Sequence, residues 1–297
     1  MQITTARRIC ENMVPFKIDL AKKTVAITGG GGVLCSEFAR ALAECGANVA
    51  LLDIKPENAQ KIAEAINDSG HGQAIAVQCD VLDKESLEKA KDIVAEKFGP
   101  CDILINGAGG NSPKCTTTKE YLFGEDLENG SAETVTFFDL LPENLRFVFD
   151  LNFTGAFLST QVFAKDMANK AGRAIINISS LNAFVPLTKI PAYSAAKAAV
   201  SNFTQWLAVH FSKVGIRVNA IAPGFFVTEQ NKNLLFDKEG NPTARTGKIL
   251  AATPMGRFGE PKELIGALLW LCCPEASGFV NGAVVPVDGG FCAYSGV

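Results

Sequence analysis

Short apolar runs rich in valine and isoleucine recur along the chain, and longer stretches with helical periodicity separate them. The apolar residues of a run do not alternate with polar ones, which is typical of strands buried on both faces. The predicted strands are Thr24–Thr28, Asn48–Asp53, Ala74–Cys79, Asp102–Asn106, Ala174–Ser179, Arg217–Ile221 and Val284–Val287. The first predicted helices are Val33–Cys45, Pro56–Asp68 and Lys84–Lys97. This alternation predicts an α/β fold with a doubly wound parallel sheet of about seven strands and helices on both faces.

Two long segments interrupt the rhythm, at about residues 110–141 and 224–259. Both follow the C-terminal ends of predicted strands, the edge where open α/β sheets bind ligands. We interpret them as irregular substrate-loop insertions in one domain that spans residues 1–297, because the chain has no internal repeat or linker. The alternative is a pair of disordered surface excursions. Aromatic residues favour packed segments: Tyr121, Phe123, Phe225, Phe226 and Phe236.

The composition excludes several classes of function. A net charge of −3 in 297 residues argues against nucleic acid or an anionic membrane as the main partner. No apolar run reaches the roughly 18 residues of a membrane span, and residues 1–15 lack the apolar stretch of a secretory signal. Nine cysteines without a CxxC spacing and only two histidines argue against a metal site, a disulfide scaffold and a histidine-based nucleophile. We therefore expect a cytoplasmic protein that acts on a small molecule.

A glycine run, Thr28-Gly29-Gly30-Gly31-Gly32, joins the first predicted strand to the first helix. Glycines at this turn let the backbone approach a diphosphate, and the helix N-terminus supplies amide donors. Asp53 ends the second strand, where a carboxylate can accept both ribose hydrogen bonds and repel a 2′-phosphate. The pattern favours NAD over NADP, although each motif, taken alone, is also compatible with an ordinary turn. Asp80 and Asn106-Gly107-Ala108-Gly109 follow the next strands and are candidates for the same site.

Tyr193 lies four residues before Lys197, and Ser180 lies thirteen residues before Tyr193. A spacing of four places a phenol and an ammonium on one face of a helix. The cation is expected to lower the phenol pKa, which suits a general acid or base. Ser180 can hold a substrate oxygen. The pair alone is weak evidence, and its position after the fifth strand strengthens it.

Together these motifs resemble the classical short-chain dehydrogenase/reductases, from Phe16 to Gly290. The resemblance rests on Thr28-Gly29, Cys79-Asp80-Val81, Asn106-Gly107-Ala108-Gly109, Leu151-Asn152, Ile178-Ser179-Ser180, Tyr193–Lys197, Pro223-Gly224 and Val287-Asp288-Gly289-Gly290. It implies a Rossmann-type fold and a catalytic tetrad of Ser180, Tyr193, Lys197 and Asn152. Tyr193 would be the acid/base, and Ser180 would polarise the carbonyl. Lys197 would bind the nicotinamide ribose and lower the phenol pKa, and Asn152 would help to hold a water relay to it.

The resemblance also implies the cofactor contacts and a homotetramer. The implied NAD contacts are Thr28, Gly29, Gly31, Gly32, Val33, Leu34, Asp53, Asp80, Val81, Asn106, Ala108, Gly109, Tyr193, Lys197, Pro223, Gly224 and Thr228. One departure concerns the family's phosphate loop, T-G-x-x-x-G-x-G. Val33 and Cys35 replace its second and third glycines, and Gly32 lies one position early.

Several segments are similar to a narrower group, the bacterial D-mannonate oxidoreductases (fructuronate reductases). That likeness implies NAD(H)-linked interconversion of D-fructuronate and D-mannonate. A sugar acid needs polar groups and a cation near the nicotinamide. The candidates are Asn111, Asn182, Gln230 and Asn231, with Lys114, Lys189 or Arg257 for the carboxylate, although any one of these cations could be a solvated surface residue. The alternatives are another sugar-acid or polyol dehydrogenase, such as a gluconate 5-dehydrogenase, and a non-catalytic dinucleotide-binding regulator.

Overall fold

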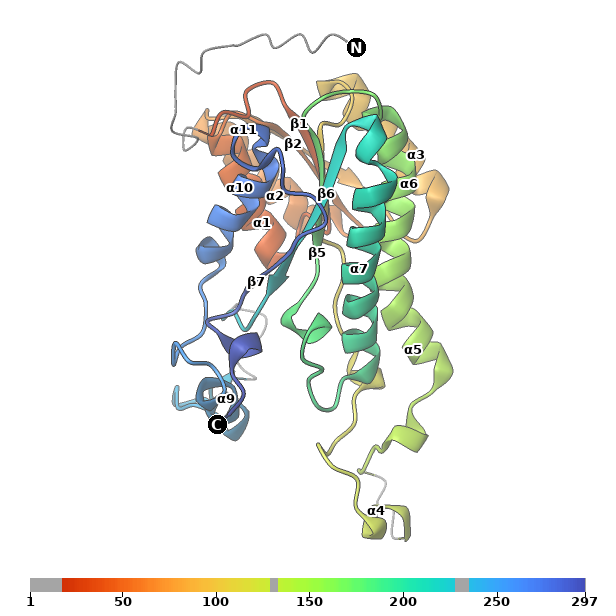
Figure 1. Cartoon of the computed structure of the whole chain (residues 1–297), viewed down its shortest axis with the longest axis vertical. Coiled ribbons are helices and arrows are strands. Elements are labelled where there is room, and N and C mark those ends of the chain that lie inside the picture. Colours follow the sequence, from red (N-terminus) through yellow and green to blue (C-terminus); the bar gives the residue numbers. More distant parts are fainter. Residues whose placement is uncertain (1–17, 129–132, 228–234, 297) are drawn as a thin grey trace, which may run out of the picture.

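The computed structural model describes residues 18–128, 133–227 and 235–296, and in it seven parallel strands form one sheet (Figure 1). The strand order is β3-β2-β1-β4-β5-β6-β7. The strands are β1 (Thr24–Thr28), β2 (Asn48–Asp53), β3 (Gln73–Gln78), β4 (Ile103–Asn106), β5 (Arg173–Ile178), β6 (Ile216–Pro223) and β7 (Val284–Val287). The predicted doubly wound α/β fold is confirmed, and strand ends differ from the prediction by at most two residues. β3 and β7 are the exceptions in burial, because both are partly exposed edge strands.

Helices cover both faces of the sheet (Figure 1). On one face lie α1 (Val33–Glu44), α2 (Pro56–Ser69) and α10 (Ile265–Cys272), with α11 (Pro274–Ser277) beside α10. On the other lie α3 (Lys84–Phe98), α6 (Gly155–Met167) and α7 (Pro191–His210), with α5 (Pro142–Phe149) against α7. Each face has its own apolar cluster, with Phe38 fully buried in one and Phe163 in the other. Burial on both faces explains why the strands are continuously apolar.

The direction of strand addition reverses between β1 and β4. β2 and β3 lie on one side of β1, and β4 to β7 lie on the other. Thr28 pairs with Asn106 in the register of β1 and β4, so both strands end at the same level. In open α/β sheets this switch point leaves a crevice at the C-terminal strand ends, and here the glycine run and the N-terminus of α1 enter it.

The first insertion forms an arm, defined here as residues 116–128 and 133–141. It contains the short helix α4 (Gly124–Glu128) and the 3-10 turn η2 (Phe137–Asp139). The arm extends past the C-terminal edge of the sheet (Figure 1). The second insertion contains the helix α9 (Ala244–Ala251). The expectation that this insertion is irregular is therefore wrong for α9, which begins at a Thr243 cap that accepts the Thr246 amide.

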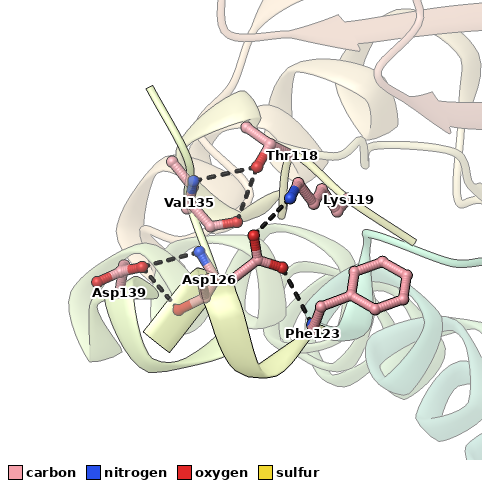
Figure 2. A network of polar contacts seen from close by, with 7 residues as sticks. Thr118, Lys119, Phe123, Asp126, Val135 and Asp139 are labelled. Carbon is pink, nitrogen blue, oxygen red and sulfur yellow. Dashed lines mark hydrogen bonds and ion pairs between the residues drawn. The ribbon is translucent and has the colours of Figure 1, made fainter. Parts of the chain in front are cut away.

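Polar contacts stiffen the arm, as Figure 2 shows. The amide of Val135 donates to Thr118 Oγ1 at 3.1 Å, and Thr118 Oγ1 donates to the Val135 carbonyl at 3.2 Å. Lys119 forms an ion pair with Asp126, whose other oxygen accepts the Phe123 amide at 3.0 Å. The Thr118–Val135 contacts join the two segments of the arm, and the contacts of Asp126 fix the first segment onto itself.

Neither a membrane-spanning helix nor a metal-binding cluster is found in residues 18–128, 133–227 and 235–296. No helix there is long and apolar enough to cross a membrane. No three histidine, cysteine or acidic side chains there are grouped to hold a metal ion.

Candidate active site

A groove of about 480 Å³ lies at the switch point between β1 and β4. Nine of the predicted cofactor residues line it: Gly29, Gly32, Val33, Leu34, Asp53, Asp80, Val81, Ala108 and Gly109. Six further lining residues were outside the predicted set of NAD contacts: Cys35, Ile54, Cys79, Gly107, Leu151 and Ile178. Ile54 lies in none of the motifs quoted for the family resemblance, and the other five lie in those motifs or in the phosphate loop without having been named as cofactor contacts.

The glycine turn fits closely against neighbouring backbone. Gly29 has φ +67°, and a Cβ there would lie 2.9 Å from Ala108 Cα. A Cβ on Gly30 would lie 2.8 Å from Leu51 Cα. Larger residues would therefore displace the loop, which leaves a backbone-lined cradle at the start of α1 of the kind that binds a diphosphate.

Cys35 accounts for the departure in the phosphate loop. Its Sγ lies 2.3 Å from the position where a Cβ on Gly107 would be. Cys35 is buried, and burial raises the pKa of its thiol to about 12. The neutral thiol therefore fills the gap between α1 and the β4 loop as a small apolar group, and Gly107 provides the space for it.

Asp53 is fixed at the far end of the groove. Its Oδ2 accepts the Gly31 amide at 2.9 Å, and its Oδ1 accepts the Lys55 amide at 2.9 Å. The carboxylate keeps free lone pairs that can accept ribose hydroxyls, while its negative charge opposes a 2′-phosphate. The donor set and the glycine cradle thus fit a dinucleotide with an unmodified adenosine ribose.

Two predicted cofactor residues have side chains in the protein interior. Thr28 Oγ1 accepts the amides of Gly107 and Ala108 at 3.1 and 3.2 Å, so it clamps the β4 loop. Asn106 Nδ2 donates to Asn177 Oδ1 at 2.8 Å and to Thr160 Oγ1 at 3.0 Å, so it joins β4 to β5 and α6. Both side chains therefore support the wall of the groove through hydrogen bonds inside the protein.

Three of the four predicted catalytic side chains meet in a second pocket, of about 210 Å³. Ser180, Tyr193 and Lys197 line it, with Pro223 and Gly224 from the end of β6. The two pockets share four lining residues: Leu34, Gly107, Gly109 and Ile178. The groove therefore continues into the catalytic pocket. A Cβ on Gly224 would lie 2.6 Å from Asp288 Cα, so glycine is required at this turn.

Lys197 is buried in the floor of this pocket. Its Nζ donates to the Ile178 carbonyl at 2.7 Å and lies 5.6 Å from the centre of the Tyr193 ring. Burial lowers the pKa of Lys197 to about 8. The ammonium still predominates at neutral pH, but it holds its proton weakly.

The pKa of Tyr193 corrects an expectation. We expected Lys197 to lower it, but the residues of the chain raise it above its usual value of 10.0. Burial is the larger cause, and the hydrogen bond with the Ser180 side chain acts in the opposite direction. The phenol loses solvation on ionising, and the ammonium proton of Lys197 is directed to the Ile178 carbonyl. Tyr193 is therefore protonated at neutral pH in this state.

Asn152 lies in a π-helical turn, η3 (Asp150–Thr154), between α5 and α6. Its Nδ2 donates to the carbonyls of Gly110 and Val148 at 2.7 and 2.8 Å. Its Oδ1 accepts the Gly110 amide at 3.1 Å. A Cβ on Gly109 would lie 2.6 Å from Asn152 Oδ1 and 3.2 Å from Lys197 Nζ. Asn152 thus holds the β4 loop next to Lys197, whereas the water relay stays a prediction.

The sequence model of the family described as short chain dehydrogenase matches residues 23–239. The chain belongs to this family. An uncharacterised oxidoreductase of Haemophilus influenzae is 61% identical over 279 residues, covering 94% of this chain and 96% of that protein. A 60% identical structure of a candidate D-mannonate oxidoreductase from Haemophilus influenza holds NAD, with TM-score 0.90 over 94% of this chain and 98% of that one. The 5-keto-D-gluconate 5-reductase of Escherichia coli is 32% identical over 271 residues, 91% of this chain and 96% of that protein.

The predicted substrate residues of this short-chain dehydrogenase are scattered. Asn182 is buried after Ser180, and its Oδ1 has no hydrogen-bond partner among the described residues. Asn111 is exposed and donates to Thr116 Oγ1 at 3.2 Å. Lys114 is exposed in the 3-10 turn η1 (Pro113–Cys115). Three further predicted residues, Thr228, Gln230 and Asn231, lie outside the described residues.

Arg257 is paired within the protein. Its guanidinium donates to both oxygens of Glu263, at 2.8 and 2.7 Å. It lines a cavity with Asp288 and Gly289 that contains none of the catalytic side chains. Because its charge is already matched, Arg257 is a weak candidate for binding a substrate carboxylate.

Lys189 lines another cavity, of about 390 Å³, next to the start of α7. Arg245 and Lys248 of α9 and Glu120 of the arm also line it. The sequence analysis named Lys189 but missed the other three. The sequence carried no signal for them, because they are ordinary charged residues in two insertions more than a hundred positions apart.

Proposed function

We propose that this short-chain dehydrogenase interconverts D-fructuronate and D-mannonate with NAD(H). One observation carries the proposal: Ser180, Tyr193 and Lys197 line a pocket that continues into a glycine-floored groove ending at Asp53. The likeness to a NAD-bound candidate D-mannonate oxidoreductase supports both the cofactor and the substrate. We also propose, from the family resemblance, a homotetramer in the cytoplasm.

The groove residues fit NAD. The amides at the start of α1 would bind its diphosphate, Asp53 the adenosine ribose, and Lys197 the nicotinamide ribose. When bound as NADH, the cofactor supplies a hydride, with its two electrons, to the ketone carbon. The catalytic pocket then has to hold the ketone and provide a proton.

Ser180 and Tyr193 perform that task. The Ser180 hydroxyl donates to the ketone oxygen and orients it. As the carbon–oxygen π bond breaks, its electron pair stays on the oxygen, and the Tyr193 O–H donates the proton that completes the alcohol. The raised pKa of Tyr193 keeps it protonated and ready for this step. Lys197 lies one turn along α7 and provides an ammonium proton that can replace the one given up.

A second sugar acid is the nearest alternative. The 32% identical relative from Escherichia coli is named as a reductase of 5-keto-D-gluconate, which is also a keto sugar acid. A dinucleotide-binding regulator without turnover has less support, because Ser180, Tyr193 and Lys197 line one pocket and Asn152 binds the loop beside it.

A substrate panel tests the proposal. The purified enzyme is assayed by NADH absorbance with D-fructuronate, 5-keto-D-gluconate, D-fructose and neutral cyclic ketones, and with NADPH in parallel. We expect the highest kcat/KM with D-fructuronate and NADH. Tyr193→Phe should lower kcat by about 10²–10⁴-fold while NADH binding, measured by fluorescence titration, is retained. A Tyr193→Phe enzyme with near-normal turnover would contradict the mechanism, and preference for another ketone would contradict the substrate.

A further inference from the structure

The cavity of about 390 Å³ is formed where the two insertions meet. Its walls are the base of the arm (Thr116 and Glu120), the segment Leu187–Ile190 and one face of α9. Ile190 is the N-cap of α7, three residues before Tyr193. Phe225, another wall residue, directly follows Gly224 of the catalytic pocket. Two chain segments thus pass directly from the catalytic pocket into this cavity.

The lining of the cavity is positively charged. Lys189, Arg245 and Lys248 are cationic, and Glu120 is the single carboxylate among the lining residues. Glu120 accepts from Lys248 Nζ at 2.7 Å, so these two charges compensate each other. Within the part of the chain that the structure describes, Lys189 and Arg245 form no ion pair. Two positive charges therefore remain for an anionic ligand.

The backbone holds the turn of Lys189 in place. Lys189 has φ +73°, a left-handed conformation that is uncommon for a residue with a side chain. Its carbonyl accepts the Thr117 amide of the arm at 2.9 Å. The arm next to Thr117 is stiffened by the Thr118–Val135 and Lys119–Asp126 contacts of Figure 2. The turn that carries Lys189 is thus joined to a stiffened part of the arm.

We propose that this cavity binds the carboxylate of the substrate, with Arg245 and Lys189 as its partners, while the ketone occupies the pocket of Tyr193. The inference rests on the proposed function, and it specifies which residues select an acid over a neutral sugar. In D-fructuronate the ketone and the carboxylate lie near opposite ends of the carbon chain. The anion site must therefore be beside the catalytic pocket and outside it.

The other cations fit this role less well. Lys197 is inside the catalytic pocket and donates to the Ile178 carbonyl. Arg257 is bound to Glu263 through both of its terminal nitrogens. Lys114 is exposed and does not line the cavity. Arg245 is the stronger of the two proposed partners, because a guanidinium binds a carboxylate through two parallel hydrogen bonds.

The test uses Arg245→Gln and Lys189→Gln in the full-length enzyme. KM and kcat are measured with D-fructuronate and with D-fructose, the neutral sugar that has CH₂OH in place of the carboxylate. If D-fructose turns over too slowly, its Ki as a competitor of D-fructuronate replaces its KM. We expect Arg245→Gln to raise KM for D-fructuronate about 10- to 100-fold, the loss of a charged hydrogen-bond pair. Values for D-fructose and the KM for NADH should stay within about twofold of the wild type.

Arg257→Gln is the matched control, since it removes an exposed guanidinium from the neighbouring cavity and should leave the ratio of acid to neutral KM unchanged. Arg245→Lys keeps the positive charge, so its preference for D-fructuronate over D-fructose should lie between that of Arg245→Gln and that of the wild type. The inference would be overturned if Arg245→Gln raised KM equally for D-fructuronate and D-fructose, or left KM for D-fructuronate unchanged.

The design separates this inference from the proposed substrate. If the wild type prefers another sugar acid, the same variants are assayed with that acid and its neutral counterpart. If KM then rises for the acid and not for its neutral counterpart, the result supports the carboxylate site although the proposed substrate is wrong. Selectivity for a phosphorylated ketose that Arg245→Gln abolishes, with sugar acids unaffected, would overturn the carboxylate assignment.

Discussion

Burial decides the protonation state of both proton-carrying residues. It raises the pKa of Tyr193 above 10.0 and lowers the pKa of Lys197 to about 8. Each residue is pushed toward its neutral form because ionisation inside the pocket loses solvation. At neutral pH this gives a protonated phenol beside an ammonium that gives up its proton easily. The pair is therefore prepared to donate a proton, which is the requirement of ketone reduction.

The two directions of the reaction should consequently respond oppositely to pH. As pH rises through about 8, Lys197 loses its proton, so kcat/KM for ketone reduction should fall. Alcohol oxidation needs an ionised phenol, and its kcat/KM should rise with pH toward the raised pKa of Tyr193. Initial-rate pH profiles from 6 to 10.5 in both directions, which report groups of the free enzyme, check this. A reduction rate that increases between pH 8 and 10 would show that Lys197 and Tyr193 titrate in another order.

At this scale the sequence predicted which side chains come together better than it predicted the contacts that hold them. Ser180, Tyr193 and Lys197 were predictable because helix spacing and strand ends determine where such side chains lie. The close fit of the Cys35 side chain against Gly107 could not be predicted, because Gly107 lies in a turn 72 positions later in the chain. The inward orientation of Asn106 was also missed, because its partners Thr160 and Asn177 come from α6 and β5.

Among the elements, the π-helical turn η3 positions a predicted catalytic residue, Asn152. An extra residue in a helical turn changes the direction of side chains, and such turns are frequent at functional sites. Here it places Asn152 against the loop that borders both the groove and the catalytic pocket. The sequence predicted Asn152 through a family motif, but the local irregularity of the helix leaves no mark in the pattern of apolar residues.

Asn152→Ala should loosen this loop. The change removes three hydrogen bonds and leaves the buried Val148 carbonyl and the part-buried Gly110 carbonyl without that partner. We expect a loss of about 1–3 kcal/mol in the free energy of unfolding, measured by urea denaturation, together with a higher KM for NADH and a lower kcat. Asn202→Ala, an exposed position on α7, is the control and should be neutral in both assays. Unchanged NADH affinity in a destabilised Asn152→Ala would limit the residue to a structural role.

The helix α9 marks the limit of prediction at the level of elements. It is only eight residues long and contains Gly247, so its helical periodicity is too short to separate from loop sequence. Its buried side chains, Thr246 and Ile249, are few. Thr246 Oγ1 contacts the Leu235 carbonyl, a contact within the second insertion that sequence spacing cannot specify.

Across the whole molecule, the two insertions form one unit although 128 positions separate Glu120 from Lys248. The sequence predicted that both would lie at the ligand-binding edge, because both follow strand ends. It could not predict that they would meet, since neither carries a pattern that specifies its partner. The ion pair between the arm and α9 joins the two insertions at the cavity that both of them line.

Exchanging the charges of this pair tests whether the two insertions act together. Lys248→Glu places two carboxylates face to face and adds negative charge to the cavity, so KM for D-fructuronate should rise about tenfold or more. The double variant Glu120→Lys with Lys248→Glu restores an attractive pair and the original net charge, and KM should return to within about threefold of the wild type. Thermal stability should hardly change in either, because exposed ion pairs contribute little to folding. Lys262→Glu, which disrupts the exposed pair with Glu260, is the control and should leave KM unchanged. A double variant as poor as Lys248→Glu would mean that Lys248 acts alone, without the arm.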